Sequence, residues 1–215
     1  MDADEVAPGT LFIISGASGT GKSSLVASLV ATEPAVRASI SHTTRPKRAA
    51  EKHGVDYHFI DVARFQTMAE EGLFLEYAQV FDHYYGTSRD WVMQRLHAGT
   101  DVVLEIDWQG ARQVRAQIPQ SVGIFILPPS RPALETRLRG RKQDTPEIIE
   151  RRLREATRDM SHFEEFDYLI INDNFALALN ELRVVILAQR LQCSRQAVRH
   201  RPLLAKLLES PSGFQ

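Results

Sequence analysis

The chain has 215 residues, the size of one domain with small additions. Apolar residues make up 43% and charged residues 25%, which excludes a disordered or collagen-like chain. A net charge of −1 gives no overall basic surface for nucleic acid, and no apolar run approaches the ~18 residues that a membrane span needs. The single cysteine, Cys193, cannot form an internal disulfide, and the acidic N-terminus has no signal-peptide layout, so we expect a cytoplasmic protein.

Apolar strands and amphipathic helices alternate through most of the chain. In chain order the pattern predicts strands at 10–15, 101–106, 122–127 and 166–171, and helices at 22–31, 108–117, 130–138 and 174–191. Because continuous apolar strands separated by helices are typical of a parallel sheet covered on both faces, we expect an α/β fold.

Three segments depart from this rhythm. Residues 39–97 mix short alternating runs with one short helix, which predicts an inserted α+β subdomain. Residues 131–158 carry eight Arg and one Lys against five acids, a net charge of +4. From Arg190 onward five basic residues stand against one acid, and we interpret this end as a solvated helix with a frayed tail; a contact surface is the alternative.

The strongest motif is Gly-Ala-Ser-Gly-Thr-Gly-Lys-Ser at residues 16–23, which matches the phosphate-binding pattern G-x-x-x-x-G-K-[ST] at every position. Glycines allow a tight turn whose N–H groups face phosphate oxygens, and the following helix adds the positive end of its dipole. Lys22 supplies a charge for the β- and γ-phosphates, and the Ser23 hydroxyl is a hard oxygen for Mg²⁺. The motif follows a predicted strand and opens a predicted helix, where this mechanism requires it. We therefore expect a nucleotide phosphate site at Gly16, Ala17, Ser18, Gly19, Thr20, Gly21, Lys22 and Ser23.

Two carboxylates, Glu105 and Asp107, lie two residues apart at the C-terminal end of a predicted strand. Doubly wound sheets place their ligand crevice at this end of the strands. Alternation along the strand directs both to the same side. Either could hold the hydration shell of Mg²⁺ or a substrate amino group. The alternatives are a helix N-cap for Asp107 and a structural ion pair for Glu105.

A second anion site is indicated between residues 41 and 87. Arg45 and Arg48, with two tyrosines at Tyr57 and Tyr85, suit a dianionic monophosphate because guanidinium groups form bidentate hydrogen bonds. Glu76 lies on an apolar segment where a carboxylate is unexpected. The alternatives are solvated surface charge for the arginines and an exposed strand position for Glu76.

Together these motifs resemble the guanylate kinase family, P-loop nucleoside monophosphate kinases that make GDP from GMP and ATP. The run Thr43-Thr44-Arg45-x-x-Arg48-x-x-Glu51-x-x-Gly54-x-x-Tyr57-x-Phe59 is similar to that family's signature over its full length. The similarity covers about residues 9–190 and includes Phe-Leu-Glu-Tyr-Ala at 74–78, Glu-Ile-Asp-Trp-Gln-Gly at 105–110 and a lid pattern from Leu134 to Leu153. Ala50 and Lys142 stand where the family usually has glycine.

The resemblance implies a division of the chain. A P-loop NTPase core would comprise residues 6–38 and 98–190, with a parallel sheet flanked by helices. Residues 39–97 would form an inserted α+β GMP-binding subdomain, and 138–155 a small helical lid within the core span. Residues 191–215 would be a basic C-terminal extension.

The resemblance also implies roles by position. Lys22 and the lid arginines would be catalytic, Ser24 and Asn172 would complete the ATP site with Asn172 beside the adenine, and Ser23 would hold Mg²⁺ partly through water. The remaining assignments are Arg137, Arg141 and Arg152 for the lid; Arg45, Arg48, Tyr57 and Tyr85 for the GMP phosphate; Ser41, Glu76 and Thr87 for guanine; and Glu105 and Asp107 for positions near nucleotide and metal.

The chemistry of guanine supports Glu76 separately. Guanine offers N1–H and its 2-amino group as adjacent donors to one carboxylate, whereas adenine would leave that carboxylate unpaired, a loss that can reject an analogue by about four orders of magnitude. The nucleophile, a phosphate with a second pKa of about 6, is already ionised near neutral pH, so in-line transfer needs no general base.

Three alternatives stay open at this point. A phosphosugar kinase of similar fold should lack Ser41 and Glu76, and a phosphopeptide-binding module should lose Lys22 or lid arginines; all are present. An RNA-binding regulator would need a net basic surface. The expected partners are GMP or dGMP and ATP, with no nucleic acid and no membrane, and a homo-oligomer is left open.

Overall fold

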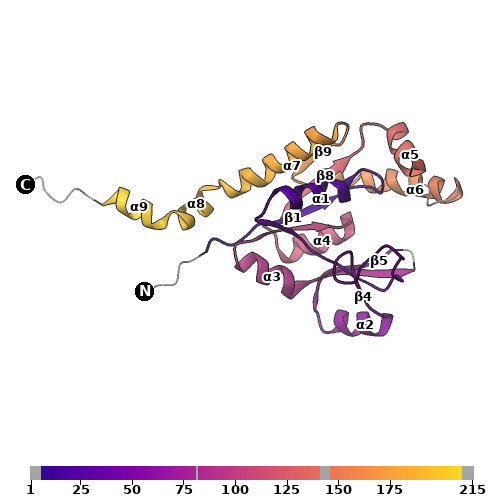
Figure 1. The fold of residues 1–215 in the computed structure, drawn as a ribbon, viewed down its shortest axis with the longest axis horizontal. Coiled ribbons are helices and arrows are strands. Elements are labelled where there is room, and N and C mark those ends of the chain that lie inside the picture. The colour runs from indigo at the N-terminus through magenta and orange to yellow at the C-terminus, as the bar shows by residue number, and fades with distance from the viewer. Residues whose placement is uncertain (1–5, 81, 141–145, 210–215) are drawn as a thin grey trace, which may run out of the picture.

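The computed structural model describes residues 6–80, 82–140 and 146–209 (Figure 1). Its elements, in chain order, are β1 (Leu11–Ser15), α1 (Lys22–Thr32), β2 (Val36–Ala38), β3 (His42–Thr43), β4 (His58–Phe59), α2 (Val62–Glu70), β5 (Phe74–Val80), β6 (His83–Ser88), α3 (Arg89–His97), β7 (Asp101–Glu105), α4 (Trp108–Gln117), β8 (Val122–Leu127), α5 (Arg131–Gly140), α6 (Pro146–Met160), the 3₁₀ helix η1 (Phe163–Glu165), β9 (Tyr168–Ile171), α7 (Phe175–Arg190), α8 (Cys193–Arg199) and α9 (Arg201–Leu208).

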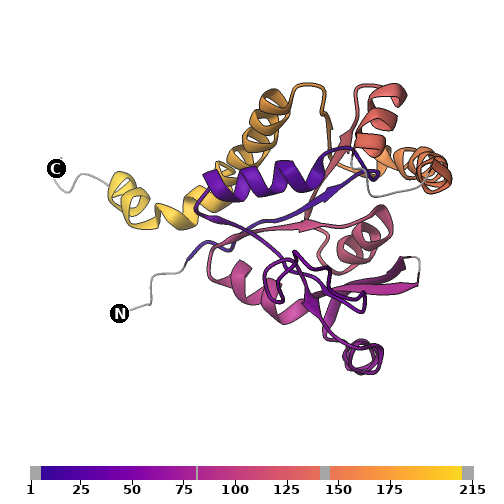
Figure 2. The same cartoon turned by 45° about the vertical axis from the view of Figure 1, so that its right-hand side comes forward.

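The larger sheet has five parallel strands in the order β2-β7-β1-β8-β9, which confirms the predicted α/β fold. All five residues of β1 are buried, as expected for a strand covered on both faces. Phe12 and Ile14 face one core with α1 and α7, while Leu11 and Ile13 face another with α3 and α4. Figure 2 shows these helix pairs on opposite sides of the sheet.

The smaller sheet has the order β4-β3-β6-β5 and mixed strand directions, and its strands lie between residues 42 and 88. We expected one helix in residues 39–97; the structure has two, α2 and α3. Helix α2 packs on the small sheet through Phe65 and Met68, whereas α3 places Val92 and Leu96 in the core of the large sheet. The short α3 was missed because three of its apolar residues, Trp91 to Met93, are consecutive and so do not show the helical spacing.

Helices α5 and α6 lie at one end of the molecule and the C-terminal helices α8 and α9 at the other (Figure 1). Ala17 of the P-loop packs with Leu134, Leu138 and Ile149 of α5 and α6. The solvated helix that we expected after Arg190 is instead two short helices, α8 and α9, in which no residue is buried. No helix in the described ranges is long and apolar enough to span a membrane.

Candidate active site

The P-loop connects β1 to α1, and its backbone geometry requires glycine. Gly16 and Gly21 have φ values of 143° and 97°, a region that residues with a side chain rarely occupy. A Cβ atom on Gly16 would lie 2.3 Å from the Ile126 carbonyl oxygen. The Lys22 Nζ donates to the carbonyl oxygens of Gly16 and Ala17 over 2.6 and 2.8 Å, so the ammonium group lies over the loop it follows.

Two predicted nucleotide-site residues brace the P-loop from behind. The Asn172 side chain, at the end of β9, is buried and donates to the Thr20 carbonyl oxygen over 2.7 Å. Arg137 of α5 donates to the Asn172 carbonyl oxygen over 2.7 Å and to that of Thr20 over 3.4 Å. Both side chains therefore tie β9 and α5 to the P-loop.

The end of β7 brings the predicted carboxylates to the P-loop. The Ser23 hydroxyl donates to Glu105 Oε1 over 2.6 Å. Asp107 is the N-cap of α4, where Oδ1 accepts from the Gly110 amide over 2.8 Å, so the N-cap interpretation of Asp107 is confirmed. Its side chain also lines the cavity described below, so the cap does not remove it from the site.

The Ser23 hydroxyl and the Glu105 carboxylate are oxygen donors of the kind that would fit a magnesium ion. Mg²⁺ prefers hard oxygen donors and is usually held by one or two protein oxygens together with phosphates and water. Within the described residues, no group of three or more His, Cys, Asp or Glu side chains could hold a metal by itself. The donor set therefore suits a metal shared with a phosphate ligand.

Glu76 on β5 is only 5% exposed, so the alternative of an exposed strand position is wrong. Its Oε1 accepts from the Thr87 hydroxyl over 2.6 Å, and Thr87 is itself fully buried on β6. Burial raises the pKa of Glu76 to about 7; the hydrogen bond from Thr87 opposes this, and the charge of Asp107 adds to it. The site thus holds a buried carboxylate whose ionised form is only partly compensated, by Thr87.

The arginine-rich segment after β3 is organised by a residue that the sequence analysis left without a role. Glu51 accepts from Arg45 Nη2 over 2.7 Å and from the backbone amide of Arg48 over 2.8 Å. The Arg45 guanidinium lies 5.5 Å from the ring centre of Tyr57, whose ring is 5.9 Å from that of Tyr85. Burial raises the pKa of the Tyr57 hydroxyl, which keeps it a proton donor. Arg45, Tyr57 and Tyr85 therefore form one cluster.

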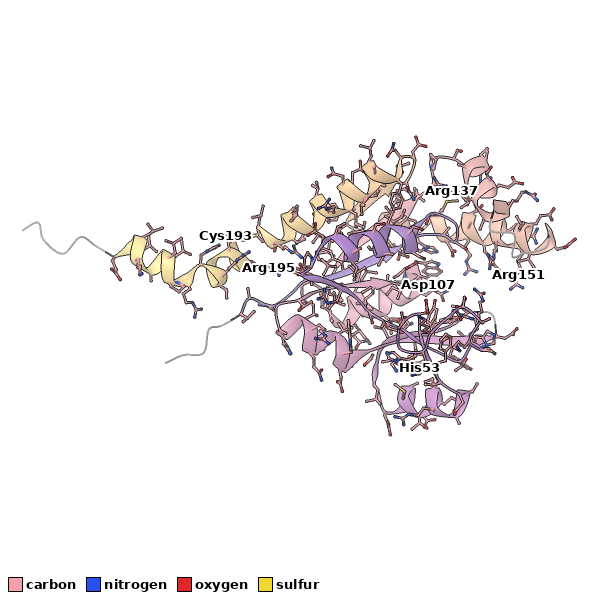
Figure 3. All side chains as sticks on the ribbon, viewed as in Figure 1. His53, Asp107, Arg137, Arg151, Cys193 and Arg195 are labelled. Carbon is pink, nitrogen blue, oxygen red and sulfur yellow. The ribbon has the colours of Figure 1, made fainter. Side chains whose placement is uncertain are left out.

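One cavity of about 620 Å³ joins the P-loop, the small sheet and α6. Asp107 from the core and Arg151 from α6, both labelled in Figure 3, belong to its wall. The predicted site residues in the wall are Gly16, Ser18, Gly19, Gly21, Lys22, Ser23, Ser41, Tyr57, Glu76, Tyr85, Glu105, Asp107 and Arg152. Those placed outside it are Ala17, Thr20, Ser24, Arg45, Arg48, Thr87, Arg137 and Asn172. Arg141 and Lys142 lie outside the described residues.

The cavity wall also contains residues that sequence reasoning missed. Trp108 stands on the core side, and its Nε1 donates to Asp159 of α6 over 3.3 Å. The Trp108 ring stacks on His162 at a centroid distance of 3.6 Å, with Arg112 on the ring 4.7 Å away. Trp108 belongs to the 105–110 motif and could have been proposed, whereas nothing in the sequence distinguishes Asp159 from the other charges of its helix.

Comparison with known proteins assigns the chain to a family. The model of the family described as "Guanylate kinase" matches residues 9–189. Similar curated proteins are the guanylate kinases of Alcanivorax borkumensis, 56% identical over 93% of this chain and 97% of that protein, and of Sodalis glossinidius, 53% identical over 93% and 98%. The crystal structure of guanylate kinase from Anaplasma phagocytophilum is similar with a TM-score of 0.75 and 28% identity, covering 98% of each chain.

Proposed function

The chain belongs to the guanylate kinase family of ATP:GMP phosphotransferases, and we propose that it transfers the γ-phosphoryl group of ATP to GMP in the 620 Å³ cavity. The observation that carries the choice of acceptor is the buried Glu76 in the wall of that cavity, with Thr87 as its hydroxyl partner. The Thr87 hydroxyl offsets only part of the desolvation cost of a carboxylate at 5% exposure, and a ligand that supplies further donors would offset more of it. The N1–H and 2-amino groups of guanine are such a pair.

The phosphate of the acceptor would bind at the arginine and tyrosine cluster. Tyr57 and Tyr85 face the cavity, and Arg45 is adjacent to both Tyr57 and Glu51. Glu51 fixes the guanidinium of Arg45 before substrate arrives, which lowers the entropy lost on binding. Arg48 is exposed and contributes its backbone amide to the same loop, so its side chain would meet the phosphate only if the loop moved toward the cavity.

The ATP phosphates would bind at residues 16–24. Lys22 would exchange the two loop carbonyls for the β- and γ-phosphates, and Ser23 with Glu105 would hold Mg²⁺, partly through water. When bound, Mg²⁺ neutralises charge on the phosphate oxygens. Asn172 would act chiefly through the backbone of Thr20, to which it is bonded, and would reach the adenine from there.

Catalysis would depend on positioning and charge rather than on a general base. The acceptor phosphate is ionised near pH 7, so no proton must be removed before attack. Arg152 faces the cavity from α6, and Arg137 lies on the far side of the P-loop. Closure of α6 over the cavity would exclude water, which would otherwise accept the phosphoryl group.

Several finer points belong to the same proposal. dGMP should also be accepted, because the contacts described involve the base and the phosphate and none requires the ribose 2′-hydroxyl. We propose a cytoplasmic location, since Cys193 is a free, exposed thiol. A homo-oligomer remains compatible with the described surface.

The test is a coupled assay of ADP release that compares the KM values of Glu76→Gln with those of the parent protein. Loss of the charged partner of two guanine donors should raise the KM for GMP about 100-fold, while the KM for ATP changes less than about twofold. Glu71→Gln, an exposed carboxylate at the end of α2, is the matched control and should leave both values unchanged. An unchanged KM for GMP in Glu76→Gln would overturn the assignment of the base pocket.

A further inference from the structure

Gly110 lies in the first turn of α4, directly against the carboxylate of Glu76. Its amide donates to the N-cap Asp107, and its backbone is buried. A Cβ atom on Gly110 would lie 2.8 Å from Glu76 Oε2 and 3.4 Å from Glu76 Cδ. Non-bonded carbon and oxygen atoms do not approach to 2.8 Å without repulsion, so a side chain at this position and the present position of Glu76 exclude each other.

The backbone of Gly110 gives no other reason for glycine. Its φ angle is that of an ordinary helix, because it is absent from the positive-φ glycines of the described chain. In a helix, alanine is favoured over glycine by about 1 kcal/mol. Glycine at this position therefore provides space for Glu76 at a small cost in helix stability.

Glu76 has little freedom to yield. Oε1 accepts from the Thr87 hydroxyl of β6 over 2.6 Å, and Oε2 lies 2.8 Å from the position that a Cβ atom on Gly110 of α4 would occupy. The Ile106 side chain borders the same space, because a Cβ atom on Gly110 would also lie 3.4 Å from Ile106 Cδ1. The carboxylate thus lies between β6 and α4, with Oε1 hydrogen-bonded to Thr87 and Oε2 directed toward Gly110.

We propose that Gly110 is a specificity-determining positioning residue: by lacking a side chain it lets Glu76 stand where both carboxylate oxygens meet the donor edge of guanine. This inference rests on the proposed role of Glu76. Two parallel hydrogen bonds tolerate only small shifts in distance and angle, and a Cβ that moves Oε2 by several tenths of an ångström misaligns both. The expected consequence is a loss of guanine affinity and of discrimination against adenine, with no effect at the P-loop.

The experiment is a double-mutant cycle of Gly110→Ala and Glu76→Asp, read as KM for GMP, KM for ATP and the GMP/AMP ratio of kcat/KM. Gly110→Ala should raise the KM for GMP at least tenfold and lower the GMP/AMP ratio similarly, with the KM for ATP within twofold. Glu76→Asp withdraws the carboxylate by one methylene and opens the contested space. Adding Gly110→Ala to Glu76→Asp should therefore change the KM for GMP less than twofold.

Each outcome decides the matter. Equal effects of Gly110→Ala in both backgrounds, or an unchanged KM for GMP in the single variant, overturn the role of Gly110. If the single variant does not fold, a folded double variant by circular dichroism supports the contact and an unfolded one overturns it. Failure of the proposed function is distinguishable, because then Glu76→Gln alone would leave the KM for GMP unchanged.

Discussion

Two buried carboxylates in this chain, Asp101 and Glu76, differ in whether the protein supplies them with a positively charged partner. Asp101, at the start of β7, is 1% exposed, and Arg190 and Arg195 reach its two oxygens over 2.7 and 3.2 Å while the Thr10 amide donates over 2.7 Å. Glu76 is 5% exposed and accepts a hydrogen bond from the Thr87 hydroxyl. In the described part of the chain, no Lys or Arg lies within ion-pair distance of its carboxylate. One carboxylate has all its partners within the protein, and the other lacks a cation.

The two carboxylates differ in role: the ion-paired Asp101 serves the stability of the fold, whereas we assign Glu76 to ligand binding. The arginines on Asp101 come from the end of α7 and from α8, so the ion pairs attach the C-terminal helices to the first residue of a central strand. The same strand ends at Glu105 beside the P-loop. A paired carboxylate thus fixes the first residue of β7, whereas Glu76, on β5 of the smaller sheet, is only partly compensated and lies in the wall of the cavity.

The largest effect that this comparison predicts is on stability. Asp101→Asn leaves Arg195 without its ion-pair partner and leaves Arg190 with only Glu33, 3.6 Å away. Breaking such a buried network should lower the free energy of unfolding by about 3 kcal/mol. Urea unfolding followed by circular dichroism measures this. Where the variant remains folded at 20 °C, its KM for GMP should equal that of the parent. An unchanged unfolding midpoint would show that the ion pairs do not hold the C-terminal helices.

For Glu76 the comparison predicts that removing the charge raises the stability of the ligand-free protein. The pKa of Glu76 rises from an ordinary value of 4.5 to about 7 on folding, so the folded protein binds the proton more tightly than the unfolded chain. That contribution is present below pH 4.5 and is lost as the pH rises through 7, which leaves a cost of about 3 kcal/mol at pH 8. Glu76→Gln has no ionised form, so the ligand-free variant should be about 3 kcal/mol more stable than the parent at pH 8 and less than about 1 kcal/mol more stable at pH 5.

Chemical unfolding of the ligand-free protein from pH 5 to 8.5 checks this difference. Glu71→Gln again serves as control and should show no pH-dependent gain, because its carboxylate is exposed. A constant difference between Glu76→Gln and the parent across this range would contradict the link between burial and charge. It would leave the effect of Glu76→Gln on GMP binding to be explained by shape alone.

The sequence predicts those features that depend on local pattern. Four of the five strands of the larger sheet, the P-loop and its Lys22 follow from periodicity and motif spacing, whereas the three-residue β2 was not predicted. The missed pairings join residues far apart in the chain. Asp101 meets arginines 89 and 94 residues away, and Asp159 meets Trp108 across 51 residues. No single-sequence pattern reports such pairings, because they are set by how the helices pack on the finished sheet.

The smallest predicted effect comes from an ion pair beside the Asp101 network. Arg183 of α7 donates to Glu33 over 2.9 Å, but its side chain is 41% exposed, and Arg190 also lies 3.6 Å from Glu33. Since Arg190 remains as a partner and water screens the exposed guanidinium, Arg183→Gln should cost less than about 1 kcal/mol of unfolding free energy. The cost should disappear in 1 M NaCl, whereas that of Asp101→Asn should persist because the Asp101 carboxylate is buried. A loss as large as that of Asp101→Asn would mean that burial is not what distinguishes the two pairs.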